Sequence, residues 1–386
     1  MKDTLTIKNF AQLASVSLEL GDLTVLVGAQ GTGKSLALQW LKLAMDGRQV
    51  VEALRAAGHE TGKEHVLVDL IFGAGMGDAW RRWSSVTWRG KKVMPQGLVR
   101  VGKGVERVFF VPAHRSMLIS DGWAAPFQRL TPETPVVARI FSQKLFERFS
   151  NRESAQLFPL DRVLRREYVD KIDAAVFHGG HVRIEEDQHH AKRLRLIHGS
   201  MHLPFMTWTA GQREFTPLLL GLHDLLPSRQ PAKPRQRKKI EDVEWVIIEE
   251  PEMGLHPQAI TVVMLLVLDL LWRGYRVVLS THSPHVLTTL WMLRRLQESG
   301  ARWQSVCEAF DVPSSQVMSG VARAALDKEY RAHLLAFEAD GKVRSTDISE
   351  LDPMSEDERI AGWGGLTEFS SRFGEVVRRA VNEGGQ

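Results

Sequence analysis

A glycine-rich segment lies between a strand pattern and a helix pattern near the start of the chain. Residues 28–35 have the sequence Gly-Ala-Gln-Gly-Thr-Gly-Lys-Ser, a GxxxxGKS spacing between the apolar runs 23–27 and 36–45. Such glycines let backbone N–H groups turn toward the β- and γ-phosphates of a nucleotide, and the following helix points its positive end at the same anion. The segment therefore predicts a nucleoside triphosphate site that is formed by Gly28, Gln30, Gly31, Thr32, Gly33, Lys34 and Ser35. Lys34 would lie between the phosphates, and the Ser35 hydroxyl would ligate Mg²⁺.

Two acidic residues end a later apolar strand. Residues 246–252 have the sequence Val-Ile-Ile-Glu-Glu-Pro-Glu, the pattern of a Walker B strand. Glu249 occupies the place of a carboxylate associated with Mg²⁺, and Glu250 would polarise the attacking water as the catalytic carboxylate.

A histidine follows a further apolar strand, at residues 275–281. Ligands of open α/β sheets bind beyond the carboxyl ends of the strands, so His282 would face the γ-phosphate. A histidine at this place is often only structural, but its order after the two earlier motifs favours a catalytic role.

Between the P-loop and the acidic strand, residues 209–214 precede a helix pattern that extends from Phe215 to Leu226. Thr209 would cap this helix, and Gly211 would allow an anion to approach its free N–H groups. Taken alone, the tetrapeptide is no more than a helix start. Its position in the order of motifs indicates a second phosphate contact, made by Thr209, Ala210, Gly211 and Gln212.

Together these motifs resemble the ABC-type ATPases outside the transporters, in the RecF/SMC/OLD-like branch. The resemblance extends from an opening strand at residues 5–10 to the segments 250–257 and 280–284. Residues 111–116 and 363–368 also resemble family elements, the latter those of compact stand-alone defence ATPases such as the PARIS and Septu components. The resemblance implies an α/β P-loop fold with mixed and parallel sheets, a mainly helical lobe, and ATP and Mg²⁺ as ligands.

In that family, the signature helix of one subunit completes the ATP site of another. The resemblance therefore implies that Thr209, Gly211 and Gln212 contact the γ-phosphate held by the partner copy's P-loop. One P-loop and one signature in the chain imply a homodimer or a larger ring of dimers. Residues 253–256 would lie across the same interface as a D-loop, or form only a strand-to-helix turn.

Three departures limit this transfer. Glu249 stands where many relatives have aspartate, so Mg²⁺ would be held through water, and Gln30 replaces a common asparagine. No glutamine has a clear place as the Q-loop residue; Gln128 and Gln143 are candidates by rough position only, and each is otherwise a surface amide.

Composition is that of a globular protein. The chain has 386 residues, 44% hydrophobic and 25% charged, with a net charge of +4 and a single cysteine, Cys307. That cysteine excludes an internal disulfide and a cysteine-based zinc site. The longest apolar stretch, 260–272, contains Asp269 and ends at Arg273-Gly274, so we expect a buried helix and no membrane contact. We also expect no signal peptide and a cytoplasmic location.

The motifs divide the chain into four expected parts. Residues 1–75 and 208–300 would form the two halves of the ATPase core, 76–207 an inserted β-rich and helical lobe, and 301–386 an extension packed on the core. The insertion lacks the sustained heptads of a coiled-coil arm, which disfavours a DNA-bridging machine of the SMC type.

Basic residues cluster in three places that would suit phosphate contacts, or be only solvated faces. They are Arg162, Arg165 and Arg166; Arg193 and Arg195; and Lys233, Arg235, Arg237, Lys238 and Lys239. Trp80, Trp83 and Trp88 lie among further basic residues, where they would stack on bases or, more commonly, pack in the core.

Three functions remain in view. The first is an ATP-gated sensor and scaffold in bacterial anti-phage defence or a toxin–antitoxin system, holding a separately encoded effector such as a nuclease. The second is a RecF-like ATPase that clamps DNA during repair. A transporter subunit is the weakest, because the motif idioms differ. OLD-like relatives carry a TOPRIM nuclease after the switch histidine, but the 104 residues beyond His282 contain no strand-ending DxD, so we expect no nuclease here.

Overall fold

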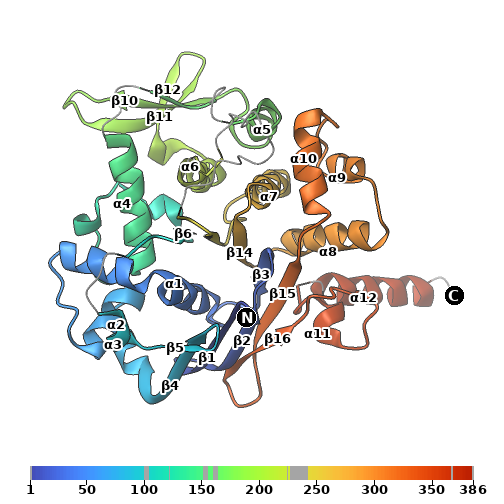
Figure 1. Cartoon of the computed structure of the whole chain (residues 1–386). Helices are drawn as coiled ribbons and strands as arrows, with labels where there is room; N and C mark the ends of the chain where they lie inside the picture. Colours follow the sequence, from blue (N-terminus) through green and yellow to red (C-terminus); the bar gives the residue numbers. More distant parts are fainter. Residues whose placement is uncertain are drawn as a thin grey trace.

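The structure is a computed structural model of the chain (Figure 1). It describes residues 2–99, 104–120, 122–150, 155–159, 164–223, 225–226, 242–366 and 368–384. Arg162 and the basic cluster from Lys233 to Lys239 lie outside these described residues.

Within the described ranges, ten strands form one mixed sheet, in the order β5-β4-β1-β2-β16-β15-β3-β14-β13-β6. In chain order they are β1 Thr4–Phe10, β2 Leu13–Glu19, β3 Leu23–Val27, β4 Trp80–Trp88, β5 Lys91–Val93, β6 Val108–Val111, β13 Trp245–Glu249, β14 Arg276–Thr281, β15 Tyr330–Phe337 and β16 Val343–Asp347. From β15 to β6 all neighbours are parallel, whereas β1 pairs antiparallel with β2 and β4. The carboxyl ends of the parallel strands therefore meet at one edge.

Two helical layers cover the parallel strands. Three helices lie on one face, namely α1 Lys34–Ala56, α2 Glu64–Phe72 and α3 Pro95–Leu98. The other face is covered by α6 Ala210–Leu222, α7 Pro257–Trp272, α8 Pro284–Glu298, α9 Trp303–Ala309 and α10 Gln316–Ala325, and α4 Val136–Ser150 contributes to both cores.

Alternate residues of each parallel strand enter these two cores. On β13, Val246 and Ile248 belong to the core beneath α7, and Trp245 and Ile247 belong to the core beneath α1. Because both faces are covered, every residue of β3 and of β13 is buried, which explains why these strands are apolar apart from Thr24 and the terminal Glu249.

A smaller antiparallel sheet forms a lobe beside α6 (Figure 1). It consists of β9 Gln156–Phe158, β10 His181–Glu186, β11 Lys192–His198 and β12 Met201–Pro204, with α5 Arg166–Ile172 and the π-helical η4 Asp173–Phe177 beside it. The remaining short elements of residues 76–207 are η1 Met76–Ala79, η2 Arg115–Leu118, β7 Ile119–Ser120, β8 Trp123–Ala124, η3 Phe127–Arg129 and η5 Phe205–Thr207. The expected inserted lobe is thus smaller than 76–207, because β4, β5 and β6 belong to the central sheet.

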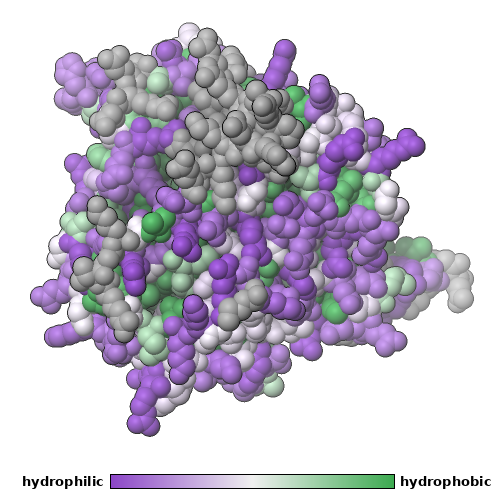
Figure 2. Space-filling view, viewed as in Figure 1, coloured by the Kyte–Doolittle hydropathy of each residue, from purple (hydrophilic) through white to green (hydrophobic). Residues whose placement is uncertain are grey.

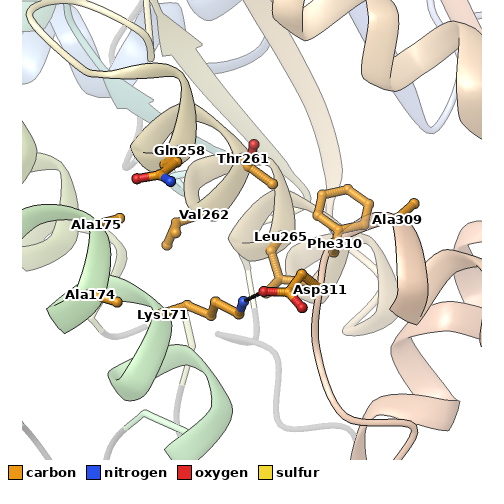
Figure 3. A pocket seen from close by; sticks show the side chains of 10 residues that line it. All are labelled: Lys171, Ala174, Ala175, Gln258, Thr261, Val262, Leu265, Ala309, Phe310 and Asp311. Atoms are coloured by element: carbon orange, nitrogen blue, oxygen red, sulfur yellow. Dashed lines mark hydrogen bonds and ion pairs between the residues drawn. The ribbon is translucent and has the colours of Figure 1, made fainter.

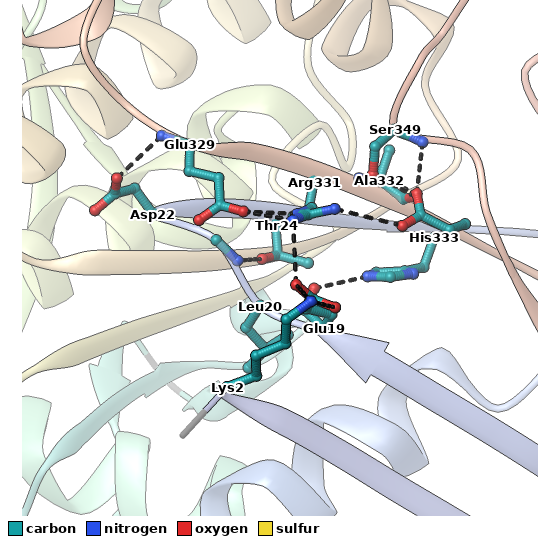
Figure 4. A network of polar contacts seen from close by, with 12 residues as sticks. Lys2, Glu19, Leu20, Asp22, Thr24, Glu329, Arg331, Ala332, His333 and Ser349 are labelled. Atoms are coloured by element: carbon teal, nitrogen blue, oxygen red, sulfur yellow. Dashed lines mark hydrogen bonds and ion pairs between the residues drawn. The ribbon is translucent and has the colours of Figure 1, made fainter. Parts of the chain in front are cut away.

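The carboxyl-terminal residues are also part of the central sheet. We expected 301–386 to pack on the core as an extension, but β15 and β16 lie between β3 and β2. The hairpin pairs in parallel with both neighbours and so satisfies two strand edges that would otherwise be open. Polar contacts reinforce this junction (Figure 4): Arg331 reaches Glu19 at 3.1 Å, and the backbone N–H of Glu329 donates to Asp22 at 3.0 Å.

The last two helices, α11 Glu358–Ala361 and α12 Glu368–Gly384, follow β16, and α12 extends away from the body (Figure 1). Figure 2 shows a face that is mainly hydrophilic, with small scattered apolar patches. The longest helix in the described part of the chain is α1, with 23 residues, so no coiled-coil arm is present there. None of the helices in that part is both long enough and apolar enough to cross a membrane.

Candidate active site

The P-loop connects β3 to α1 at the carboxyl edge of the parallel strands. Gly28, Gly31 and Gly33 all have positive φ values. At Gly28 a Cβ atom would lie 2.2 Å from the carbonyl oxygen of Leu335 on β15, so only glycine fits there. The loop is further fixed by the amide of Gln12, which donates to the Gly31 carbonyl at 2.7 Å.

Lys34 is buried at the start of α1. Its ammonium donates to the carbonyls of Gly28 at 2.7 Å and Ala29 at 3.1 Å, inside the loop. Burial lowers the pKa of Lys34 to about 8, although Glu250 and Glu252 oppose the shift. A bound triphosphate would supply the negative charge that this ammonium lacks.

Glu249 ends β13 and is buried. Its Oε2 accepts a hydrogen bond from the backbone N–H of Ala113 at 3.1 Å, whereas Oε1 meets no donor among the described residues. Burial raises the pKa of Glu249 to about 6, against the hydrogen bonds from Ala113 and from the Ser35 side chain.

A carboxylate oxygen that is buried without a donor, beside the Ser35 hydroxyl, fits a hard cation such as Mg²⁺. In the part of the chain that the structure describes, no group of three or more His, Cys, Asp or Glu side chains is placed to hold a metal alone. Mg²⁺ here would therefore take its other ligands from phosphate and water.

Glu250 and His282 lie side by side. His282 Nε2 is 3.3 Å from Glu250 Oε1. Glu250 has a φ of 41°, which is unusual for a residue with a side chain, and its backbone N–H donates to Ser280 at 2.9 Å. The structure thus brings the two predicted catalytic residues together beside Glu249.

Glu252 holds the loop that carries His282, a role that the sequence did not reveal. Its Oε1 accepts from the Thr281 hydroxyl at 2.7 Å and from the His282 backbone N–H at 2.6 Å. The only sequence signal for this role of Glu252 was its place in the acidic run after β13. The role itself was not visible, because the partners of Glu252 lie about thirty residues further along the chain.

The signature residues form a capped helix start. Thr209 accepts a hydrogen bond from the Gln212 N–H, and the Gln212 side chain accepts one from the Thr209 N–H, each at 3.2 Å. Gln212 Nε2 also donates to the Val176 carbonyl at 3.1 Å. The Gln212 amide is therefore engaged at both ends, which leaves Thr209, Ala210 and Gly211 as the accessible part of the predicted anion contact.

A cavity of about 360 Å³ opens at this helix start. Its lining includes Thr209, Gly211, His178, Gly254 and His256. Gly211 lies against the predicted D-loop, since a Cβ there would be 3.0 Å from the Gly254 carbonyl oxygen. Across the described ranges, no hydrogen bond or ion pair joins residues 209–212 to residues 28–35.

A second cavity, of about 430 Å³, lies beside η4 (Figure 3). Gln258 and Thr261 of α7 border it, and Lys171 of α5 forms an ion pair with Asp311 at its rim. The cavity shares Ala175 with the signature cavity but contains none of the predicted site residues.

Arg115 is a further residue whose role the sequence left open. It is fully buried in η2, and its guanidinium donates to the carbonyls of Pro112, Glu249, Glu250 and Glu214. Its carboxylate neighbour is Glu214 on α6, at 3.8 Å. The segment Pro112–Arg115 follows β6, which pairs with β13. Its only sequence signal was the resemblance of residues 111–116 to a family element.

Neither glutamine candidate for the Q-loop occupies that segment. Gln143 on α4 accepts from the Phe127 N–H at 2.7 Å and donates to Glu147 at 2.7 Å, so its amide is used locally. Gln128 is exposed in η3. The residue that reaches Glu249 from the loop after β6 is instead Ala113, through its backbone N–H.

Some of the basic and aromatic residues that were candidates for contacts with phosphates or bases are buried, and others are exposed. Arg165 is buried against Asp269 at 3.3 Å, and Arg193 contacts Asp187 at 3.1 Å. Trp80 and Trp88 pack on Trp40 and Trp245 respectively. Trp83 alone of the three tryptophans is exposed, at 66%.

Comparison with known proteins gives one family match. Residues 120–288, less than half of the chain, match the family described as "AAA domain, putative AbiEii toxin, Type IV TA system". No protein of curated function matches.

Among solved structures, similar chains include SMC heads at low identity. One is an SMC head bound to the C-terminal winged-helix domain of ScpA (11% identity, 93% of this chain and 99% of that chain, TM-score 0.42). Another is the SMC head domain from Thermotoga maritima (12%, 90% and 98%, TM-score 0.36). A third is an Smc head with an extended coiled coil bound to the C-terminal domain of ScpA, from Pyrococcus furiosus (11%, 90% and 96%, TM-score 0.40). The loop 28–35 between β3 and α1, the large mixed sheet and the family match to residues 120–288 are consistent with an α/β fold of the P-loop kind.

Proposed function

We propose that the chain hydrolyses ATP at a site shared by two of its copies, arranged head to tail, and that this assembly gates a separately encoded effector in bacterial anti-phage defence. The observation that carries the proposal is the division of the site into two halves. The P-loop, Glu249, Glu250 and His282 gather at one edge of the sheet, whereas the signature residues open onto a cavity of their own. A second copy would bring one half to the other.

In the proposed reaction the P-loop backbone and Lys34 hold the triphosphate. Ser35 and Glu249 would hold Mg²⁺, which when bound neutralises charge on the β- and γ-phosphate oxygens. Glu250 accepts the proton of a water whose oxygen bonds to the γ-phosphorus as the β–γ bridging bond breaks. His282, 3.3 Å from Glu250, orients that carboxylate and donates toward the γ-phosphate. Thr209, Ala210 and Gly211 of the partner copy would stabilise the same phosphate.

The defence role is supported by the description of the matched family, which names a toxin of a type IV toxin–antitoxin system. In this proposal the effector, a nuclease or toxin, is a separate chain.

A DNA clamp is the second candidate, and one feature favours it. Arg81, Arg82 and Trp83 form a bulge on β4, where the pairing with β1 shifts between Lys8 and Phe10. All three are exposed, and neither arginine has an ion-pair partner within the described residues. Such a group suits a nucleic-acid backbone and an unstacked base.

The shared mechanism is tested with Glu250→Gln. This variant should bind Mg-ATP, hydrolyse it at least about a hundredfold more slowly and accumulate as a dimer or larger assembly, measured by mass photometry. The same variant without nucleotide is the control. Wild-type hydrolysis by Glu250→Gln would contradict the assignment of the catalytic carboxylate.

The two biological roles are separated by a pull-down of Glu250→Gln with Mg-ATP from its native host, with and without nuclease. A stoichiometric protein that survives nuclease supports the sensor. Nucleic acid without a stoichiometric protein supports the clamp, and the clamp also predicts hydrolysis that DNA stimulates and salt suppresses steeply.

A further inference from the structure

One guanidinium connects the two halves of the proposed site within a single copy. Arg115 Nη1 donates to the Glu249 carbonyl at 2.9 Å and to the Pro112 carbonyl at 3.2 Å. Its Nη2 donates to the Glu250 carbonyl at 3.3 Å, and its Nε to the Glu214 carbonyl on α6 at 3.3 Å. The loop after β6, the end of β13 and the signature helix thus converge on one side chain.

Arg115 contacts Glu250 at a point where the backbone of Glu250 is strained. A φ of 41° costs a residue with a Cβ about 1 kcal/mol or more, and such a conformation persists only where surrounding contacts impose it. Two contacts do so here: the Glu250 N–H donates to Ser280, and the Glu250 carbonyl accepts from Arg115. This conformation directs the Glu250 carboxylate toward His282.

Arg115 contacts α6, the signature helix, in the first turns of that helix. Glu214 is 8% exposed, and its carboxylate accepts from the Ser116 hydroxyl and lies 3.8 Å from Arg115 Nε. Pro217 lies inside α6 one turn later and has no N–H for the Arg213 carbonyl, so one hydrogen bond of the helix is missing there. The start of α6 is therefore held by η2 as well as by the rest of its own helix.

We infer that Arg115 is a positioning residue that couples the signature helix to the catalytic carboxylate. When the start of α6 engages the nucleotide of a second copy, any shift of Glu214 is carried through Arg115 to the carbonyls of Glu249 and Glu250. Hydrolysis then depends on assembly, because the Arg115 side chain contacts both the signature helix and the backbone of Glu250. The inference rests on the proposed function and adds to it the residue that links binding to catalysis.

The simpler role of a buried arginine is to stabilise the fold, and the chain offers a matched control for that role. Arg139 on α4 is 1% exposed, stacks on the Phe127 ring at 4.0 Å and contacts His59 at 2.7 Å. Within the described residues, neither of these contacts involves a predicted site residue. Arg115→Lys and Arg139→Lys each keep the charge and lose the planar fork, so they should perturb stability in similar ways.

The experiment measures thermal stability, nucleotide affinity and ATP hydrolysis against protein concentration, for wild type, both lysine variants and Glu214→Gln. Arg115→Lys should bind nucleotide within about twofold of wild type and assemble at a similar concentration. Its maximal hydrolysis rate should fall by on the order of a hundredfold, because a misplaced catalytic group costs that much. Arg139→Lys should keep the wild-type rate per folded molecule.

A double-mutant cycle then tests the path through α6. Glu214→Gln should lower the hydrolysis rate, and its effect should largely vanish in the Arg115→Lys background, since both changes break the same link. Hydrolysis by Arg115→Lys at the level of Arg139→Lys would overturn the inference, as would additive effects of Arg115→Lys and Glu214→Gln. If wild type hydrolyses ATP without dependence on its concentration, the proposed shared site fails instead.

Discussion

At the scale of residues, the site contains buried ionisable side chains that lack some of their charge and hydrogen-bond partners in the protein alone. Lys34 is buried against carbonyl oxygens, and Glu249 is buried with one oxygen, Oε1, that accepts no hydrogen bond from a described residue. Burial therefore lowers the pKa of Lys34 and raises the pKa of Glu249, and both shifts favour the neutral form of the side chain. A triphosphate and Mg²⁺ would supply the missing partners, so ligand binding should be coupled to protonation.

The first prediction concerns Lys34. The pKa of Lys34 is about 8 in the free protein, so at pH 8.5 most Lys34 side chains are neutral. A bound triphosphate favours the charged ammonium, so Lys34 takes up a proton from solution when the triphosphate binds. We expect ATP binding without Mg²⁺ to take up a fraction of a proton near pH 8.5 and almost none from Lys34 at pH 6.5. Calorimetry in two buffers of different ionisation enthalpy measures this uptake. Equal proton exchange at the two pH values would contradict the placement of Lys34.

The second prediction concerns Glu249. A folded-state pKa of about 6, above its ordinary value of 4.5, means that its contribution to stability is complete below pH 4.5 and is lost as pH rises through 6. The loss is about 2 kcal/mol. Without nucleotide, Glu249→Gln should therefore gain about 2 kcal/mol relative to wild type between pH 4.5 and pH 7, in urea denaturation. A difference that is constant with pH would show that the Glu249 carboxyl titrates normally.

At the scale of elements, the P-loop is shaped by its neighbours as much as by its own sequence. Gly28 lies under the carbonyl of Leu335 on β15, and Gln12, in the turn between β1 and β2, holds the Gly31 carbonyl. The loop therefore packs directly on the carboxyl-terminal hairpin and on the turn between β1 and β2.

A matched pair of glycine substitutions tests this arrangement. Gly28→Ala places a Cβ against backbone and should cost about 3 kcal/mol or more of unfolding free energy. Gly31→Ala also has a positive φ but meets open space, and should cost only about 1 kcal/mol. Denaturant unfolding of both variants measures the difference. Equal losses would mean that β15 does not pack on the P-loop as described.

Local patterns were sufficient to predict that residues 28–35 connect a strand to a helix, that acidic residues end β13, that His282 follows a strand and that Thr209 caps α6, because each is encoded within a few adjacent residues. Arg115 was not predictable in its role, since its partners Glu214 and Glu249 lie 99 and 134 positions away. The place of β15 and β16 inside the sheet was missed for the same reason: nothing within the hairpin indicates which strands it will separate. Gln212 was expected to contact phosphate, but its amide is used by the helix cap and by Val176, contacts that the tetrapeptide alone does not show.

At the scale of the whole molecule, the arrangement of half-sites defines how the protein would work. In the proposed assembly, the P-loop half and the signature half of one copy serve different ATP sites, and Arg115 joins the two halves inside that copy. Assembly of two copies would close two ATP sites at once, and hydrolysis would open them. An effector held by the assembled state would then be released or activated by a change in ATP occupancy.

The most direct test of this account mixes two inactive variants. Lys34→Ala removes the P-loop charge, and Ala210→Glu places a carboxylate on the signature face, where it suits a helix start but repels phosphate. Each variant alone should hydrolyse no ATP. If the sites are shared head to tail, an equimolar mixture should recover about a quarter of the wild-type rate, because half of the pairs are mixed and each mixed pair has one intact site. A mixture as inactive as its components, despite subunit exchange shown by mass photometry, would contradict the shared site.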